Sequence, residues 1–208
     1  PVTYIITRET SQVTSVSVIE PHYYMDVPEV TEPGTPSQAH QQFNAAKVLD
    51  QYGQEMTGQT VTWRVADDAG NPVTGVSIDD NGKLTVTNEA PAITVYVTAT
   101  CLGIESNQTK MTLSKDPSKD SFVKICNQVG KAPETSLLIP TGSIPRSEDY
   151  TAKVYDQYGK LTSGMVFWKL DKSYTGVELD DTSIPGSATL KVDNTATPGT
   201  IKLIATCS

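Results

Sequence analysis

Adjacent carboxylates come nearest to a chemical site in this chain of 208 residues. Asp79-Asp80 and Asp180-Asp181 each follow a Gly-Val-x-(Ile/Leu) run, and further aspartates flank a short polar stretch near the middle of the chain. Calcium takes roughly six to eight oxygen ligands, which loop carboxylates can supply. Turn formation is the competing explanation, because Asp beside Asn-Gly or Pro-Gly is favoured for local hydrogen bonding alone. The candidate calcium ligands are Asp79, Asp80, Asp116, Asp120, Asp180 and Asp181.

Exposed tyrosines are candidate carbohydrate contacts, because a flat ring can stack on the face of a sugar. Tyr23 and Tyr24 are adjacent in a Pro-rich segment, and Tyr96 has an outward position in a run of alternating residues. Two adjacent tyrosines could equally pack onto their own domain. Trp63 and Trp168 alternate with apolar residues, so we expect them in the core.

Catalytic motifs do not occur in this sequence. The histidines are His22 and His40, and no HxH, HxxxH or CxxC spacing is present. No Gly-x-Ser-x-Gly elbow, phosphate-binding loop or dinucleotide fingerprint occurs either. Sequence order alone does not exclude a Ser-His-Asp triad. We expect no catalytic residues and no enzyme, and no required cofactor, with calcium kept open.

A tandem duplication organises these residues. Asp-Gln-Tyr-Gly occurs at 50–53 and again at 156–159, an offset of 106. Trp63 and Trp168 are 105 residues apart, and Cys101 and Cys207 are 106 apart. One order at one spacing indicates two copies of one unit. The polar segment around Pro117 is the natural boundary, which predicts domains at 1–117 and 118–208.

Almost every apolar run alternates with period two, which predicts half-buried strands. We match residues 4–7 with 122–125, and residues 15–21 with 135–140. That alignment leaves an insertion at about 22–42 in the first unit. Asn81-Gly82 between alternating runs predicts a hairpin. The second unit stops one residue after Cys207 and so is one strand short. Either the fragment was cut there or another segment fills the edge.

The cysteines and the charge bound the class of protein. Cys101 and Cys207 fall on apolar faces, which favours buried thiols, although one bridge from Cys126 to either remains open. The net charge of −8 falls entirely within residues 1–117, which disfavours nucleic acid and allows divalent cations. No apolar stretch approaches the ~20 residues of a membrane span. Residue 1 begins no signal peptide, so we expect a piece of a longer protein.

Short strands, frequent turns and a Trp on a core strand predict an all-β chain of two tandem immunoglobulin-like β-sandwich domains. Each unit runs from Val-x-Asp-Gln-Tyr-Gly through an alternating strand with Trp to Gly-Val-x-(Ile/Leu)-Asp-Asp, Leu-x-Val and a strand ending Ala-Thr. This order resembles the bacterial immunoglobulin-like repeats of S-layer proteins, adhesins and large secreted polysaccharide-degrading enzymes. The resemblance implies an extracellular or cell-wall location and no shared catalytic residues.

We therefore expect a non-catalytic structural or spacer module of a bacterial surface or S-layer-type protein. Its expected partners are other domains of the same chain, neighbouring copies, and cell-wall or other polysaccharide. An acidic first unit and a neutral second unit could favour head-to-tail contacts in self-assembly. The alternatives are a carbohydrate-binding or adhesive accessory module, and an immunoglobulin-like decoration domain of a phage tail or capsid.

Overall fold

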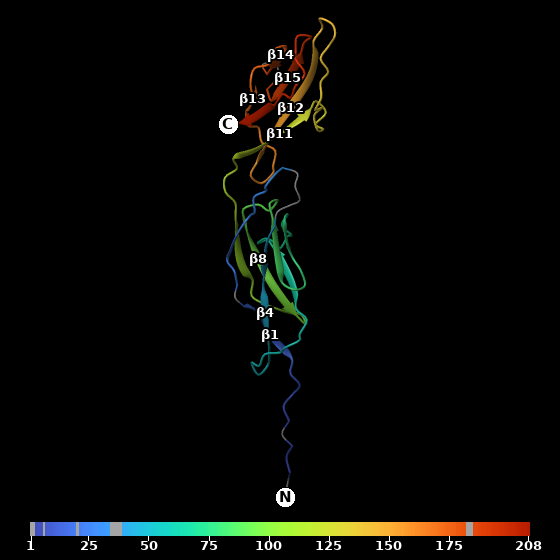
Figure 1. Ribbon diagram of the computed structural model, residues 1–208. Coiled ribbons are helices and arrows are strands. Elements are labelled where there is room, and N and C mark those ends of the chain that lie inside the picture. Colours follow the sequence, from blue (N-terminus) through green and yellow to red (C-terminus); the bar gives the residue numbers. More distant parts are fainter. Residues whose placement is uncertain (1–2, 6, 20, 34–38, 182–184) are drawn as a thin grey trace. The chain divides into compact units, whose positions relative to one another are not determined.

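The computed structural model describes residues 3–5, 7–19, 21–33, 39–181 and 185–208, and its strands fall into two compact units (Figure 1). Unit 1 comprises Pro1–Pro28 and Ser37–Asp116, and unit 2 comprises Glu29–Pro36 and Pro117–Ser208. Each is a β-sandwich of the immunoglobulin-like class, as the sequence predicts. No helix in the described ranges is long and apolar enough to cross a membrane.

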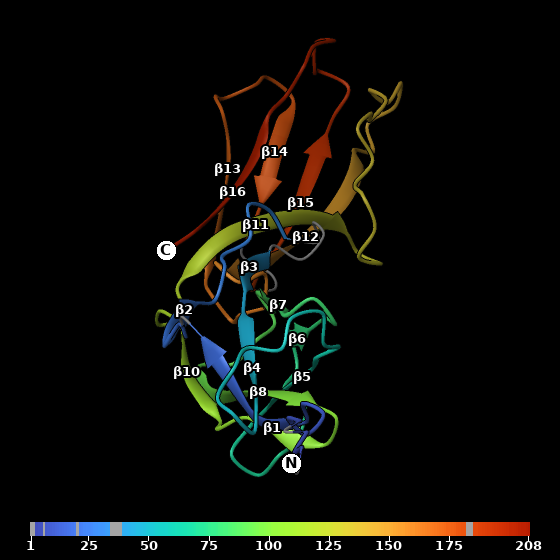
Figure 2. The same ribbon diagram turned by 90° about the horizontal axis from the view of Figure 1, so that it is seen from below.

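The described residues of unit 1 form three sheets. The largest runs β2-β10-β8-β5, with β9 paired to β8, and the others are β1-β4 and β3-β7-β6. Figure 2 shows β1 beside β4 and β10 beside β2. The strands are β1 Val13–Ile19, β2 Tyr24–Asp26, β3 Ala39–Phe43, β4 Ala45–Asp50, β5 Thr62–Ala66, β6 Val76–Ile78, β7 Lys83–Thr87, β8 Ile93–Cys101, β9 Ile104–Glu105 and β10 Thr109–Ser114.

Alternation along the strands builds the core of unit 1. In β8, Val95, Val97 and Ala99 are fully buried, while the residues between them are only partly buried. Strand residues point to opposite faces in turn, so one face of β8 packs inward. Cys101 ends this face at 1% exposure beside Val16 and Val48, which confirms the predicted buried thiol.

The part of unit 2 that the structure describes forms a four-stranded sheet and a strand pair. The orders are β11-β12-β15-β14 and β13-β16. Trp168 is buried with Tyr150 and Leu190. In unit 1, Trp63 is partly buried and packs against the core. Both tryptophans are therefore packing residues, as expected. All three cysteines are free, with Cys126 buried and Cys207 half-buried. The strands are β11 Asp120–Asn127, β12 Arg146–Asp156, β13 Val166–Leu170, β14 Val177–Asp180, β15 Ser187–Val192 and β16 Leu203–Cys207.

The strand register corrects the predicted matching of the two units. β1 pairs Val13 with Asp50 and has an irregularity before Ser15, and β11 pairs Asp120 with Asp156 and has the same irregularity before Phe122. β11 is therefore the counterpart of β1, not of residues 4–7. The described residues among 4–7 and 135–140 form no strand.

Residues 22–42 are not an insertion, although the alternation suggests one. They include β2 and most of β3, so they are not only loop. Nineteen residues separate β1 from β3, and eighteen separate β11 from β12. β3 and β12 occupy the same register as well, because His40 pairs with Val86 and Arg146 pairs with Val192, an offset of 106 on both sides. The apparent insertion follows from matching the wrong first strands.

Candidate functional site: a clasp at the repeated turn

The first Asp-Gln-Tyr-Gly turn is built around the carboxylate of Asp50. The Asp50 side chain accepts hydrogen bonds from the backbone N–H of Tyr52 at 2.9 Å and of Gln54 at 2.8 Å. Gly53 closes the turn at φ +72°, a conformation that glycine adopts without strain. The second carboxylate oxygen of Asp50 accepts the hydroxyl of Ser11 at 2.8 Å. The turn thereby holds a residue 39 positions earlier, just before β1.

Gln51 adds two hydrogen bonds to residues 10–12, the segment just before β1, which we call the leading segment of unit 1. Its Oε1 accepts the backbone N–H of Gln12 at 2.8 Å, and its Nε2 donates to the backbone oxygen of Thr10 at 3.0 Å. A primary amide can donate and accept at once, so one side chain satisfies two backbone groups of an unpaired segment. We name this set of five hydrogen bonds the clasp.

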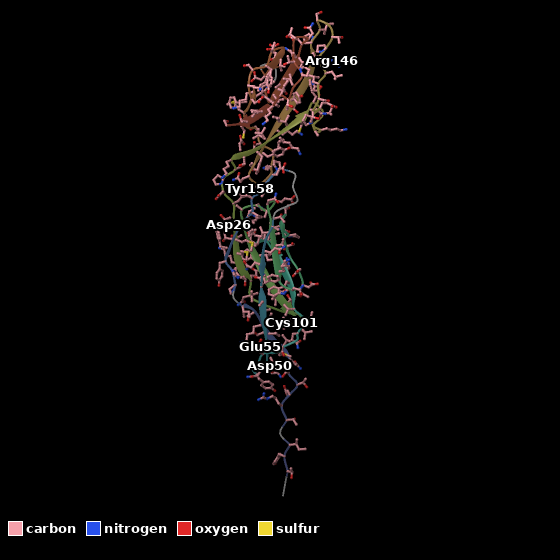
Figure 3. All side chains as sticks on the ribbon, viewed as in Figure 1. Asp26, Asp50, Glu55, Cys101, Arg146 and Tyr158 are labelled. Atoms are coloured by element: carbon pink, nitrogen blue, oxygen red, sulfur yellow. The ribbon has the colours of Figure 1, made fainter. Side chains whose placement is uncertain are left out.

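Unit 2 repeats the clasp bond for bond. Asp156 accepts the Ser118 hydroxyl at 2.7 Å and the backbone N–H groups of Tyr158 at 3.0 Å and Lys160 at 2.9 Å. Gln157 accepts the N–H of Lys119 at 2.9 Å and donates to the backbone oxygen of Pro117 at 2.9 Å. Figure 3 labels Asp50 in the first clasp and Tyr158 in the turn of the second.

The two clasps differ in how far they are covered. In unit 2, Gln157 is 2% exposed, and its backbone oxygen accepts the N–H of Val30 at 2.9 Å. In unit 1, Gln51 is exposed and Tyr52 is 39% exposed, with the guanidinium of Arg8 4.8 Å above its ring. Hydrogen bonds shielded from water are electrostatically stronger, so the second clasp is the more tightly held of the two.

Hydrogen bonding sets the charge state of Asp50. The pKa of Asp50 lies below its usual value of 3.8. It is lowered by hydrogen bonds from the backbone N–H of Gln54, the Ser11 hydroxyl and the N–H of Tyr52, and by the charge of Arg8. Burial acts in the opposite direction and raises this pKa. Donors to a carboxylate favour its ionised form. At neutral pH the clasp therefore contains a charged acceptor, whose hydrogen bonds are stronger than neutral ones.

The Gly-Val-x-(Ile/Leu)-Asp-Asp runs end differently in the two units. In unit 1, Asp79 accepts the backbone N–H groups of Asn81 and Lys83, each at 2.9 Å, so this carboxylate forms the predicted hairpin turn. Asp80, beside it, is exposed. In unit 2, Asp180 ends β14 and lies 3.3 Å from the ammonium of Lys191, and Asp181 is exposed. Equivalent sequence positions therefore have different partners.

The remaining calcium candidates belong to different units. Asp116 is exposed in unit 1, and Asp120 begins β11 in unit 2, where it accepts the Thr162 hydroxyl at 2.7 Å. Among the described residues, no group of three or more His, Cys, Asp or Glu could hold a metal ion. Calcium binding by these aspartates stays a prediction.

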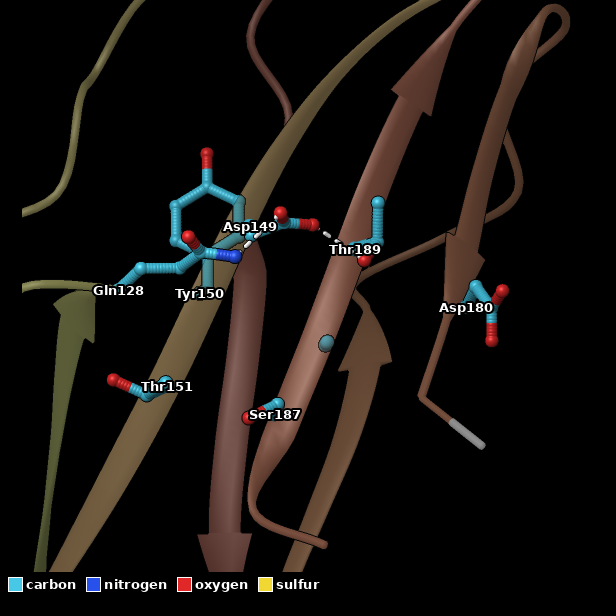
Figure 4. Close-up of a pocket in the computed structure, with 8 residues that line it drawn as sticks. Gln128, Asp149, Tyr150, Thr151, Asp180, Ser187 and Thr189 are labelled. Atoms are coloured by element: carbon cyan, nitrogen blue, oxygen red, sulfur yellow. Dashed lines mark hydrogen bonds between the residues drawn. The ribbon is translucent and has the colours of Figure 1, made fainter. Parts of the chain in front are cut away.

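A small pocket of about 170 Å³ in unit 2 contains two carboxylates (Figure 4). Asp149 lies between Gln128 and Thr189 and accepts a hydrogen bond from each, at 2.7 and 2.6 Å. Asp180 lines the same pocket from β14. These two hydrogen bonds link β12 to β15 and to Gln128 after β11, so Asp149 has a structural role here.

The structure places two of the three tyrosine candidates on one face of a sheet. Tyr24 is level with Thr112 of β10, and Thr112 is level with Thr94 of β8. Thr94 and Tyr96 are two residues apart on one strand and so point the same way. Tyr24 is 57% exposed and Tyr96 is half-buried. Tyr23 is 67% exposed and lies just before β2.

His40 lies in β3, with its Nδ1 2.7 Å from the backbone oxygen of Asp26. Neither histidine is part of a candidate metal group among the described residues.

Comparison with known proteins assigns no family to this chain. No protein-family model matches it, and no curated protein sequence matches it. Domains 4 and 5 of the S-layer protein SbsC are similar in structure at 16% sequence identity and a TM-score of 0.32, over 95% of this chain and 94% of that one. The longer S-layer structure rSbsC(31-844) gives 16% identity and a TM-score of 0.33, over 96% of this chain and 27% of its own length. The adhesin InvE of Yersinia pseudotuberculosis gives 11% and 0.30, over 95% and 58%.

Proposed function

We propose that this chain is a non-catalytic, load-bearing spacer of a bacterial surface protein of the S-layer or adhesin type. The clasp carries this proposal, because the same five hydrogen bonds recur in both units where each leading segment meets its first strand. A pulling force transmitted along the chain reaches this segment before it reaches the strand ladders. Fastening the segment delays the peeling of β1 or β11.

Pulling single molecules by their two ends tests the proposal. Gln51→Ala removes the two bonds to Gln12 and Thr10 while leaving the turn intact, so we expect unit 1 to unfold at a lower force. Gln54→Ala is the matched control, because Gln54 bonds Asp50 through its backbone rather than its side chain. Equal unfolding forces for Gln51→Ala and the parent would count against a load-bearing clasp.

A second candidate function, polysaccharide binding, rests on the outer face of the β2-β10-β8-β5 sheet. Tyr24 and Tyr96 share that face and lie two strands apart. The polar residues on the same face are Thr94, Lys110 and Thr112. Strand spacing puts the two tyrosine backbones roughly 12 Å apart. Two rings could stack on separate sugars of one chain while the hydroxyl and ammonium groups form hydrogen bonds.

Polysaccharide pull-down distinguishes this candidate from the spacer role. We expect Tyr24→Ala with Tyr96→Ala to abolish retention on cell-wall polysaccharide, and Tyr23→Ala to leave it unchanged. If the parent chain is not retained, the carbohydrate candidate is removed while the spacer proposal stands.

A further inference from the structure

One asparagine of this chain lies in an acceptor sequence for N-linked sugars. Asn107-Gln108-Thr109 has the required pattern, an asparagine followed two positions later by Ser or Thr with no proline between. No other asparagine of the chain has Ser or Thr at that distance. Asn127-Gln128-Val129 comes nearest, and it differs from the acceptor sequence only by the missing hydroxyl. The remaining asparagines are Asn44, Asn71, Asn81, Asn88 and Asn194.

The acceptor sequence lies where a bulky group can be attached without disturbing the core. Asn107 and Gln108 connect β9 to β10, and both are exposed. Glu105, the last residue of β9, is also exposed, whereas Ser106 is only 8% exposed. Successive side chains of an extended chain point to opposite sides, so Glu105 and Asn107 point outward while Ser106 points inward.

Ser106 fixes the backbone on the N-terminal side of Asn107. Its N–H donates to the backbone oxygen of Ala99 at 2.8 Å, and its hydroxyl oxygen accepts the N–H of Ala99 at 3.0 Å. The same hydroxyl donates to the backbone oxygen of Asn107 at 2.9 Å. These hydrogen bonds use only the backbone of Asn107, so they hold the loop in place while the side chain stays in solvent.

The side-chain amide of Asn107 is available for reaction. Within the part of the chain that the structure describes, this amide forms no hydrogen bond. Other asparagines use theirs: the Nδ2 of Asn44 donates to a backbone oxygen of the β6–β7 turn at 3.0 Å, and the Oδ1 of Asn127 accepts two backbone N–H groups of its own turn. Asn107 therefore combines the acceptor sequence with an exposed and uncommitted amide nitrogen.

We propose that Asn107 is the attachment site of an N-linked oligosaccharide, donated by a lipid pyrophosphate and transferred by an oligosaccharyltransferase. The Nδ2 of Asn107 attacks the anomeric carbon of the first sugar. A C–N bond forms and the bond from that carbon to the pyrophosphate oxygen breaks. The nitrogen gives up one proton, and the lipid pyrophosphate leaves with the bonding electrons. The carboxylate of Glu105 offers a contact by charge to a transferase that requires an acidic residue beside its acceptor.

The position of Thr109 indicates when the transfer takes place. Thr109 is the first residue of β10, where it pairs with Val97 of β8 and is half-buried. A transferase that reads the Thr hydroxyl must therefore act before β10 pairs with β8, or through local opening at the end of the strand. The inference rests on the proposed surface location, because lipid-linked oligosaccharides are transferred to chains that are exported.

Export of the full chain from a bacterium that produces an oligosaccharyltransferase and its lipid-linked oligosaccharide tests the site. We expect the mass of tryptic peptide 84–110 to increase by one oligosaccharide, with fragmentation placing the sugar on Asn107. Asn107→Gln and Thr109→Val should abolish the increase, and Thr109→Ser should keep it because the hydroxyl remains. The same thermal unfolding for all three variants would show that none of them acts by disturbing the fold.

A second exported protein with an established acceptor sequence, modified in the same cells, shows that the transferase is active. A parent chain that stays unmodified beside it would overturn the proposal. An increase in mass that persists in Asn107→Gln would overturn it as well, because the sugar would then be attached elsewhere. Neither result bears on the unfolding force of the Gln51→Ala variant, so the spacer role and the sugar attachment can fail separately.

Discussion

A carboxylate is the residue type that the clasp requires. Asp156 receives donors at both oxygens, a hydroxyl at one and two backbone N–H groups at the other. The Asp side chain is short enough to accept hydrogen bonds from the backbone of its own turn. A charged carboxylate makes each of these hydrogen bonds stronger than a neutral acceptor would. Asp156 is 3% exposed and Tyr158 is 5% exposed, so the backbone N–H of Tyr158 would have little access to water if the carboxylate were removed.

Asp156→Ala should lower the free energy of unfolding of unit 2 by about 3 kcal/mol, because it removes three hydrogen bonds and takes the acceptor away from the buried N–H of Tyr158. Asp156→Asn should cost only about 1 kcal/mol, since an amide oxygen can still accept both N–H groups and the amide nitrogen can donate to Ser118. Denaturant titration in a Trp63→Phe background would follow unit 2 through Trp168. Similar losses for the two variants would show that charge, rather than the number of acceptors, dominates.

Acid should loosen the clasp of unit 1. The pKa of Asp50 is lower in the folded chain than its usual value of 3.8, so its stabilising effect is complete above that value. The effect is lost as the pH falls through the lowered pKa. Asp50→Asn should therefore flatten the dependence of unit 1 stability on pH in this acid range, measured by denaturant titration above and below pH 3.8. Asp80→Asn, at an exposed turn position, should leave the slope unchanged.

At the scale of elements, the β6–β7 turn shows a hairpin whose chemistry is local. Asp79 bonds the N–H groups two and four residues later, and Gly82 takes a φ of +76° before β7 begins. This is the arrangement of a type I turn followed by a left-handed residue, a common hairpin connection. A Cβ at Gly82 would also collide with the backbone oxygen of Asn44 and lie 2.9 Å from the Trp63 ring.

Gly82→Ala should therefore destabilise unit 1 by more than Gly53→Ala. Gly53 has a similar φ of +72° but no atom within 4 Å of where a Cβ would lie, so its substitution costs only the left-handed strain of about 1–2 kcal/mol. The excess for Gly82→Ala measures the steric collision alone. Thermal unfolding of both variants gives the comparison, and equal losses would mean that the β6–β7 turn shifts to accommodate the methyl.

The sequence predicts the later strands of each unit better than the first. Asp-Gln-Tyr-Gly, the tryptophans and the strand-end cysteines anchor the register from residue 50 onward, and β5, β8, β13 and β16 lie where alternation predicts them. Before residue 50 no such marker exists, so alternation alone matches residues 4–7 with β11, which is wrong. Alternation predicts that a run can form a strand but does not identify its partner.

The clasp itself is not predictable from the sequence, although three of its seven residues in unit 1 are in the most obvious motif. Asp and Gly correctly indicate a turn, yet Gln51 and Gln157 bind backbone groups about 40 residues earlier. The leading segments share only the serine of Ser11 and Ser118, because the other contacts use backbone atoms. The recurrence of one serine at an offset of 107 is the only available signal.

At the scale of the whole molecule, the two units differ in how completely their cores close. Unit 1 buries a large set of apolar side chains to 1% exposure or less, while the most buried described apolar residues of unit 2 remain at 3%. Partial exposure of the core side chains reduces both the hydrophobic and the dispersion contributions to stability. In unit 1 the fully buried set is Leu84, Val86, Ala90, Val95, Val97, Ala99, Cys101, Met111 and Leu113.

Unit 2 should therefore unfold before unit 1, as a separate transition on heating. Amide hydrogen exchange should be fastest in β16 and β13, since among the described residues β16 pairs with β13 alone, whereas β8 pairs with β5, β9 and β10. A single transition, or slower exchange in β16 than in β8, would mean that the less complete core of unit 2 does not limit its stability.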